Sequence, residues 1–165
     1  MCDKSPLTLF DGVYIHPESY GCVLVIGAWN FPLLLTLAPV LPALAAGNAV
    51  VMKPSEISPA TARALQDLIP KYLDDRCVKV QRSKTLQSFV PTSIVQVVCG
   101  GVQETTELLK EKFDYIFYTG GTSVGRIIAQ AASKHLVCFI YNLSISIHIS
   151  VITVVEFLDV SGEIQ

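Results

Sequence analysis

Short apolar runs alternate along this chain with longer segments whose apolar residues recur at helical spacing. Continuous apolar runs that stop at turn residues are typical of strands buried on both faces. Such runs predict four strands, at 22–26, 49–52, 94–98 and 115–119. The intervening periodicity predicts four helices, at 31–46, 58–73, 104–112 and 123–136. Strands that alternate with helices predict an α/β fold in which a parallel sheet carries helices on both faces.

The first two helices have distinctive ends and interiors. Segment 31–46 is apolar all round and is therefore predicted to be buried, but Pro39 and Pro42 should kink or divide it. The second helix should begin where Ser58 supplies a capping hydroxyl and Pro59 occupies the first helical position. In the fourth helix, Val124 is among the residues predicted to face the sheet.

Two segments break this alternation. Residues 75–93 are rich in Lys and Arg and have weak periodicity, which predicts a long exposed loop inserted into the domain. Residues 137–165 form an apolar tail, in which 143–150 alternates with the period of a strand but no helix follows to cover it. The regular pattern therefore predicts one domain at 12–136 with two additions.

The composition is unusually apolar for a soluble domain. Of 165 residues, 51% are hydrophobic and 16% charged, against about 25% charged in an average domain. This excludes intrinsic disorder, and a net charge of −2 without a basic run gives no indication of a nucleic-acid surface. A membrane protein using 19–52 and 136–155 is a further hypothesis, but glycines and prolines divide the first stretch into pieces too short to span.

Cysteine and histidine positions indicate neither a metal site nor a disulfide framework. Five scattered cysteines form no C-x-x-C pair, and His16, His135 and His148 lack neighbours at ligand spacing. Each cysteine is predicted to be a small core residue rather than a nucleophile. No signal peptide is visible, so a cytoplasmic, reducing environment is expected.

Candidate chemistry lies where three predicted strands end. The turns at 28–30, 53–56 and 119–121 share one edge if the strands are parallel, and ligands bind beyond the carboxyl ends of such strands. Glycines at 120–125 between a strand and a helix suit either a phosphate or a tight turn, and spacing does not separate the two. The Lys-[Ser/Thr] pair of a Walker A motif is absent, which disfavours P-loop chemistry.

Each polar residue at this edge suits two roles. Lys53 and Glu56 suit a ribose, but also a simple exposed salt bridge. Asn30 suits an oxyanion donor, but helix capping accounts for it more simply. Trp29 is more often a core residue than part of a ligand site.

The sequence at these turns resembles the aldehyde dehydrogenase superfamily. The resemblance rests on Gly-Ala-Trp-Asn-Phe-Pro at 27–32, Ala-Ala-Gly-Asn-Ala-Val at 45–50 with Lys-Pro-Ser-Glu at 53–56, and Phe-Tyr-Thr-Gly-Gly-Thr-Ser-Val-Gly at 117–125. Residues 104–109 and 113–118 look like the class 3, fatty aldehyde branch. The match covers 12–74 and 94–136.

This resemblance implies a Rossmann-like domain that binds NAD or NADP. It also implies oxidation of aldehydes, medium- or long-chain aliphatic or aromatic, to carboxylic acids, in a homodimer with possible membrane association. Position by position, the resemblance implies that Lys53 and Glu56 hold the adenosine ribose and that Thr119, Gly120 and Gly121 lie at the pyrophosphate. It implies that Val124 packs on the adenine side and that Trp29 approaches the cofactor. It also implies that Asn30 donates to the oxyanion of the thiohemiacetal. Glu56 should disfavour the 2′-phosphate of NADP, whereas Lys53 tolerates it.

The chain also departs from the family pattern. The family's nucleophile is a cysteine in Gly-Gln-x-Cys, and no cysteine here has that context. Its general base is a glutamate in Glu-Leu-Gly-Gly, but residues 137–142 read Val-Cys-Phe-Ile-Tyr-Asn, and Glu156 and Glu163 do not fit the motif. These departures predict an incomplete aldehyde dehydrogenase fold, from a truncated or mis-spliced product or a genuine variant, without turnover alone. The alternative is a non-catalytic fragment that associates with full-length subunits.

Overall fold

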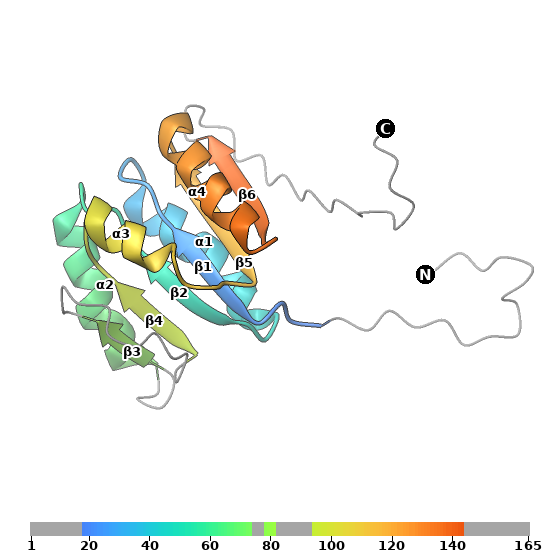
Figure 1. Cartoon of the computed structure of the whole chain (residues 1–165). Helices are drawn as coiled ribbons and strands as arrows, with labels where there is room; N and C mark the ends of the chain where they lie inside the picture. The colour runs from blue at the N-terminus through green and yellow to red at the C-terminus, as the bar shows by residue number, and fades with distance from the viewer. Residues whose placement is uncertain (1–17, 74–77, 82–93, 144–165) are drawn as a thin grey trace, which may run out of the picture.

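Six parallel strands form one sheet in the computed structural model, which describes residues 18–73, 78–81 and 94–143 (Figure 1). The strands are β1 (Cys22–Ile26), β2 (Ala49–Lys53), β3 (Val78–Gln81), β4 (Val95–Val98), β5 (Tyr115–Gly120) and β6 (Cys138–Leu143), in the order β3-β4-β2-β1-β5-β6. The helices are α1 (Pro32–Ala45), α2 (Pro59–Tyr72), α3 (Val102–Leu108) and α4 (Thr122–Lys134). The predicted α/β class is confirmed, as are the four predicted strands and four predicted helices.

The strand order reverses at β1. From β1 the chain proceeds through β2 to β4 on one side, and it then returns to place β5 on the other side of β1. Cys22 is paired with Ala49, and Val23 with Tyr115, in parallel register. A crevice therefore opens at the carboxyl ends of β1 and β5, where such a sheet binds ligands.

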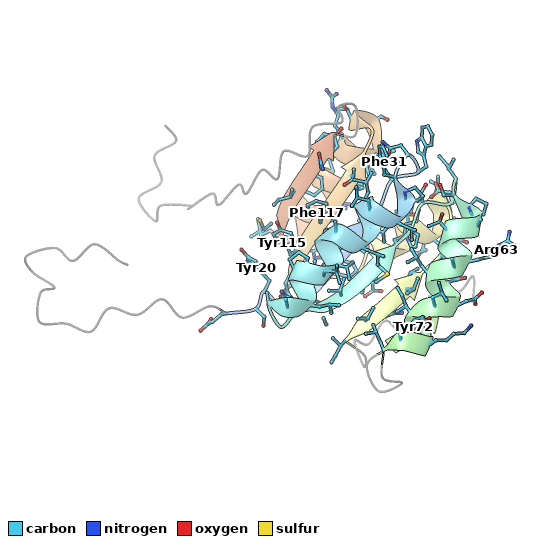
Figure 2. The ribbon with its side chains drawn as sticks, turned by 180° about the vertical axis from the view of Figure 1, so that it is seen from behind. Tyr20, Phe31, Arg63, Tyr72, Tyr115 and Phe117 are labelled. Carbon is cyan, nitrogen blue, oxygen red and sulfur yellow. The ribbon has the colours of Figure 1, made fainter. Side chains whose placement is uncertain are left out.

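Alternate strand residues build a separate core on each face of the sheet. Val23, Val25, Val50 and Met52 pack with Val40 of α1, and α1 and α2 cover this face (Figure 2). The opposite face lies under α3 and α4 (Figure 1). Its buried residues are Leu24, Ile26, Val51, Val98, Leu108, Phe113, Ile116, Tyr118, Ile128 and Ala132. Burial on both faces explains the continuous apolar runs of the central strands.

Helix α1 differs from its prediction in its burial. It runs undivided from Pro32 to Ala45 with Pro39 and Pro42 inside it. It is not buried all round, because the sheet covers one side of it. Thr36 and Val40 are buried, whereas Leu41 is 65% exposed, and Leu33 and Leu34 are also exposed.

The two predicted additions contain strands. Residues 78–81 form β3, which pairs in parallel with β4, so the prediction of a loop is wrong there. In the tail, β6 pairs with β5, and α4 packs against both strands, so part of the tail is covered by a helix. The remaining residues of 74–93, the alternating stretch from 144 onward and the N-terminal residues to 17 lie outside the described residues.

The described residues bear on the membrane and metal hypotheses. Over 18–73, 78–81 and 94–143, no helix is long and apolar enough to cross a membrane, and no cluster of His, Cys, Asp and Glu is suited to a metal ion.

Cys22, Cys99 and Cys138 are free thiols; Cys138 is exposed, which corrects its predicted core placement. Burial, followed by the nearby Asp114 carboxylate, raises the pKa of the Cys22 thiol to about 11. His16 and His148 lie outside the described residues.

Candidate functional site

A cleft of about 490 Å³ opens at the carboxyl edge of the sheet, where the strand order reverses between β1 and β5. The three predicted turns converge on it, and helices α3 and α4 contribute one wall. All eight residues predicted for the site line this cleft: Trp29, Asn30, Lys53, Glu56, Thr119, Gly120, Gly121 and Val124. The parallel-strand argument for a shared edge is thus confirmed.

Two hydrogen bonds join the turn after β1 to the turn after β2. The Gly27 N–H donates to the Lys53 carbonyl at 3.1 Å, and the Ser58 hydroxyl donates to the Trp29 carbonyl at 3.2 Å. Ser58 is the N-cap residue of α2, but its side chain does not cap the helix as predicted. Its hydroxyl instead fixes the turn that carries Trp29 and Asn30.

Trp29 and Asn30 are placed differently from the simpler expectations. Trp29 is 60% exposed and lines the cleft, so its predicted core placement is wrong. The N-cap residue of α1 is Phe31 rather than Asn30. Trp29 and Asn30 are both exposed and line the cleft, so both are accessible to a molecule in it.

Lys53 and Glu56 form the predicted ion pair within the cleft. Lys53 Nζ lies 2.5 Å from Glu56 Oε2, with the lysine side chain 5% exposed and the glutamate side chain 43% exposed. Partial burial acts to raise the pKa of the Glu56 carboxyl, but the hydrogen bond from Lys53, a hydrogen bond from the Glu56 backbone and the charge of Lys53 together outweigh it and lower the pKa. The glutamate therefore remains a charged acceptor at the open side of the cleft, and a carboxylate has more acceptor positions than one lysine occupies.

The glycine turn after β5 presents an open backbone to the cleft. Among the described glycines, positive φ values occur at Gly21 and Gly47, so a left-handed conformation does not account for the turn. Gly121 is the N-cap residue of α4, and a Cβ built there would meet no described atom within 4 Å. The free space lies at the N-terminus of a 13-residue helix, where backbone N–H groups and the helix dipole favour an anion.

Thr119 leaves a polar atom unpaired beside this turn. It is 1% exposed, and its Oγ1 has no hydrogen-bond partner among the described residues. A buried hydroxyl without a partner costs about 1–3 kcal/mol. Thr119 lines the cleft, but Oγ1 itself is closed off from it, so the side chain must rotate before a polar group of a ligand can supply the missing partner.

Sequence reasoning missed part of the apolar lining of the cleft. Val124 is 45% exposed and lines the cleft as the resemblance implied, whereas Ile127 is 60% exposed and lies there rather than against the sheet as its periodicity predicted. Val102 of α3 faces the same space and is 79% exposed. An apolar slot beside an ion pair and a glycine turn can take a flat ring, a ribose and phosphates together.

Known proteins share both the sequence and the fold. The model of the aldehyde dehydrogenase family matches residues 11–154, which extends past 136 into the tail for which no family match was expected. The chain is 50% identical to "Aldehyde dehydrogenase family 3 member A2" of Pongo abelii over 133 residues, 81% of this chain and 24% of that protein. It is 51% identical to "Aldehyde dehydrogenase, dimeric NADP-preferring" of Mus musculus over 133 residues, again 81% of this chain and 26% of that protein.

A solved structure of similar fold is the substrate-bound state of Staphylococcus aureus AldH. It superimposes with a TM-score of 0.71 at 37% identity, covering 86% of this chain and 27% of that one. The chain thus spans about a quarter of the length of the relatives that it matches. Because the family model covers most of the sequence and the parallel sheet has the family's Rossmann-like fold, this chain belongs to the aldehyde dehydrogenase family.

Proposed function

We propose that the cleft binds NAD or NADP and that this chain is the cofactor-binding part of an aldehyde dehydrogenase of family 3. The observation that carries the proposal is the convergence of the eight predicted residues on one cleft at the point where strand order reverses. In the complete enzyme, the substrate class is aldehydes, aliphatic of medium or long chain or aromatic, which are oxidised to carboxylic acids.

The residues present fit a dinucleotide. The Lys53–Glu56 pair is suited to the hydroxyls of a ribose, and the N-terminus of α4 at Gly121 to the pyrophosphate. Thr119, whose hydroxyl lacks a partner among the described residues, lines the same cleft, and rotation of its side chain would bring that hydroxyl to a phosphate oxygen. Val124, on the apolar wall, packs on the adenine side.

Asn30 and Trp29 line the same cleft. The Asn30 amide is assigned as the donor to the substrate oxygen that becomes negatively charged during the reaction. Trp29 is assigned to the vicinity of the cofactor, on the turn that Ser58 holds. When bound, the dinucleotide supplies a nicotinamide ring that accepts a hydride.

The choice between the two dinucleotides depends on Glu56. A charged carboxylate beside the ribose repels a 2′-phosphate, while Lys53 offsets part of this repulsion. We therefore propose that both cofactors bind, with NAD favoured. Dimer formation, cytoplasmic location and association with membranes remain expectations from the resemblance.

Titration of the purified chain with NAD and NADP tests the proposal. Trp29 is the chain's single tryptophan and lines the cleft, so its fluorescence should change on saturation with either dinucleotide. Adenosine, which lacks the pyrophosphate, should bind more weakly. The chain should form no reduced nicotinamide from an aliphatic aldehyde, since it contains no Gly-Gln-x-Cys segment. A chain that binds neither dinucleotide at millimolar concentration would contradict the proposal.

A second function is favoured by the surface of α1. Leu33, Leu34 and Leu41 are exposed on one helix, and an apolar patch of this kind indicates an interaction surface. This favours a non-catalytic fragment that associates with full-length subunits. Native mass measurement of the chain mixed with a full-length family 3 enzyme tests it, and the absence of a mixed complex would remove it.

A further inference from the structure

Two tyrosines contact the glycine turn from the side of the sheet. The Tyr141 hydroxyl of β6 donates to the Gly120 carbonyl at 3.1 Å, and the Tyr118 hydroxyl of β5 donates to the Gly121 carbonyl at 3.2 Å. The two rings are stacked, with centroids 5.7 Å apart and planes at 12°. Consecutive carbonyls of the turn therefore each receive one phenol.

The protons of this cluster can be assigned. A phenol has one proton, and that of Tyr141 is donated to the Gly120 carbonyl. In the 3.2 Å contact between Tyr141 and Thr122, the Thr122 hydroxyl is therefore the donor. Burial, followed by the neighbouring Tyr141, raises the pKa of the Tyr118 phenol, so it remains protonated at physiological pH.

The glycines at 120 and 125 make room for these rings. A Cβ on Gly120 would lie 2.2 Å from the Tyr118 hydroxyl oxygen, and one on Gly125 would lie 3.2 Å from the Tyr141 ring. Gly121, by contrast, borders open space. Gly120 and Gly125 thus leave space for the tyrosine side chains, and Gly121, between them in the sequence, faces the cleft.

Planarity of the peptide bond links these contacts to the cleft. In a trans peptide, the C=O and N–H groups point in opposite directions. Holding the carbonyls of Gly120 and Gly121 toward the tyrosines therefore turns the N–H groups of Gly121 and Thr122 away from them. Those two N–H groups belong to the N-terminus of α4, which opens on the cleft.

We propose that Tyr118 and Tyr141 are positioning residues for the pyrophosphate, because their hydroxyls fix the two peptide units whose N–H groups receive it. The inference rests on the proposed dinucleotide function. It gives a role to β6, the strand at which the sequence departs from the family pattern. Neither residue takes part in the chemistry of the substrate.

The test compares ligands with and without a pyrophosphate. Tyr118→Phe and Tyr141→Phe each keep the ring and its stacking but remove the hydroxyl. Each variant should bind ADP-ribose and NAD about three- to tenfold more weakly, the effect expected for one hydrogen bond. The affinity for adenosine should stay within about twofold, because adenosine does not reach the turn.

A structural role alone would give a different pattern. Tyr115→Phe is the matched control, since Tyr115 lies on the same strand at its opposite end and packs against Tyr20 in a tilted arrangement. It should change neither affinity. Amide resonances of Gly121 and Thr122, followed by NMR, should shift on addition of ADP-ribose in the wild-type chain and less in Tyr141→Phe.

The outcomes separate the inference from the function on which it rests. Unchanged ADP-ribose affinity in both variants, or an equal loss for adenosine and ADP-ribose, overturns the positioning role while the function stands. A wild-type chain that binds neither ADP-ribose nor NAD overturns both. Should Tyr118→Phe not fold, Tyr141→Phe still decides the question, because Tyr141 lies on the last described strand and is only partly buried.

Discussion

Replacing Thr119 with valine should make the free protein more stable and the cofactor complex weaker. The two side chains have nearly the same shape, and the Thr119 Oγ1 has no partner among the described residues. Its desolvation costs about 1–3 kcal/mol. Thr119→Val should therefore raise the free energy of unfolding by about 1–2 kcal/mol. For a chain of this size that raises Tm by roughly 2–8 °C.

Binding should change in the opposite direction. If ligand oxygens pair with the Thr119 hydroxyl, its loss should weaken NAD binding by about three- to tenfold. Denaturation in urea followed by circular dichroism gives the stability, and quenching of Trp29 fluorescence gives the affinity. In wild-type protein, NAD at about 100 times its Kd should add about 2.7 kcal/mol to the free energy of unfolding.

Thr36 supplies the matched control. It is 0% exposed, but its hydroxyl donates to the Pro32 carbonyl at 2.7 Å. Thr36→Val should therefore destabilise the chain by about 1 kcal/mol and leave NAD affinity unchanged. If Thr119→Val is less stable than wild type, or binds NAD equally well, then the Thr119 hydroxyl is already satisfied without a ligand and the reasoning fails.

Three further outcomes are expected. Glu56→Gln removes the charge that repels a 2′-phosphate, so the ratio of NADP to NAD affinity in calorimetric titrations should rise about tenfold; an unchanged ratio would show that this carboxylate does not discriminate. Gly120→Ala should lower the free energy of unfolding by about 1–3 kcal/mol, because its Cβ meets a buried phenol. Gly121→Ala should lower the free energy of unfolding by less than about 1 kcal/mol yet weaken NAD binding. Equal losses of stability in the two variants would contradict this difference. The Cys22 thiol, with a pKa of about 11, should react with iodoacetamide at pH 8 far more slowly than the exposed Cys138 thiol. Its reaction rate should increase as the pH rises toward 11, and peptide mass spectrometry measures the modification of each cysteine separately.

The central part of the fold could be predicted because its strands are buried on both faces. β1 and β2 are continuous apolar runs bounded by turn residues, and few structures besides a buried parallel strand produce this pattern. β3 was missed because Val-Lys-Val-Gln is a four-residue alternation within a charged segment, as is usual for an edge strand. Its pairing with β4 depends on contacts that local sequence does not reveal.

The exposure of α1 could not be predicted from its composition. An all-apolar helix indicates burial, but not what buries it. Leu41 is 65% exposed here because the sheet contacts the opposite side of the helix. The same reasoning failed for Ile127, since helical periodicity cannot separate side chains that pack on a sheet from side chains that line a cleft.

The site was predictable as a location but not as a set of contacts. Parallel strand ends meet at one edge, and this argument alone brings Lys53 and Gly120 together. That argument could not predict the hydrogen bond from Ser58 to Trp29 or the one from Tyr141 to Gly120, because each joins residues distant in sequence. A serine before proline predicts a cap, but tertiary geometry gave its hydroxyl another partner.

The reversal of strand order at β1 also has a consequence for how the chain folds during synthesis. One edge of β1 pairs with β2, which follows it closely in the sequence, whereas β5, the partner on the other edge, lies far along the chain. Cys22 and Asp114, which are hydrogen-bonded where β1 and β5 begin, are 92 residues apart. Such distant pairing is slow, because the entropic cost of closing the long loop comes before the stabilising contacts form. Until the ribosome has delivered β5, the apolar strand Cys22–Ile26 has an unpaired edge. The nascent chain is therefore most prone to aggregation in this interval, and the ligand cleft is among the last features to form.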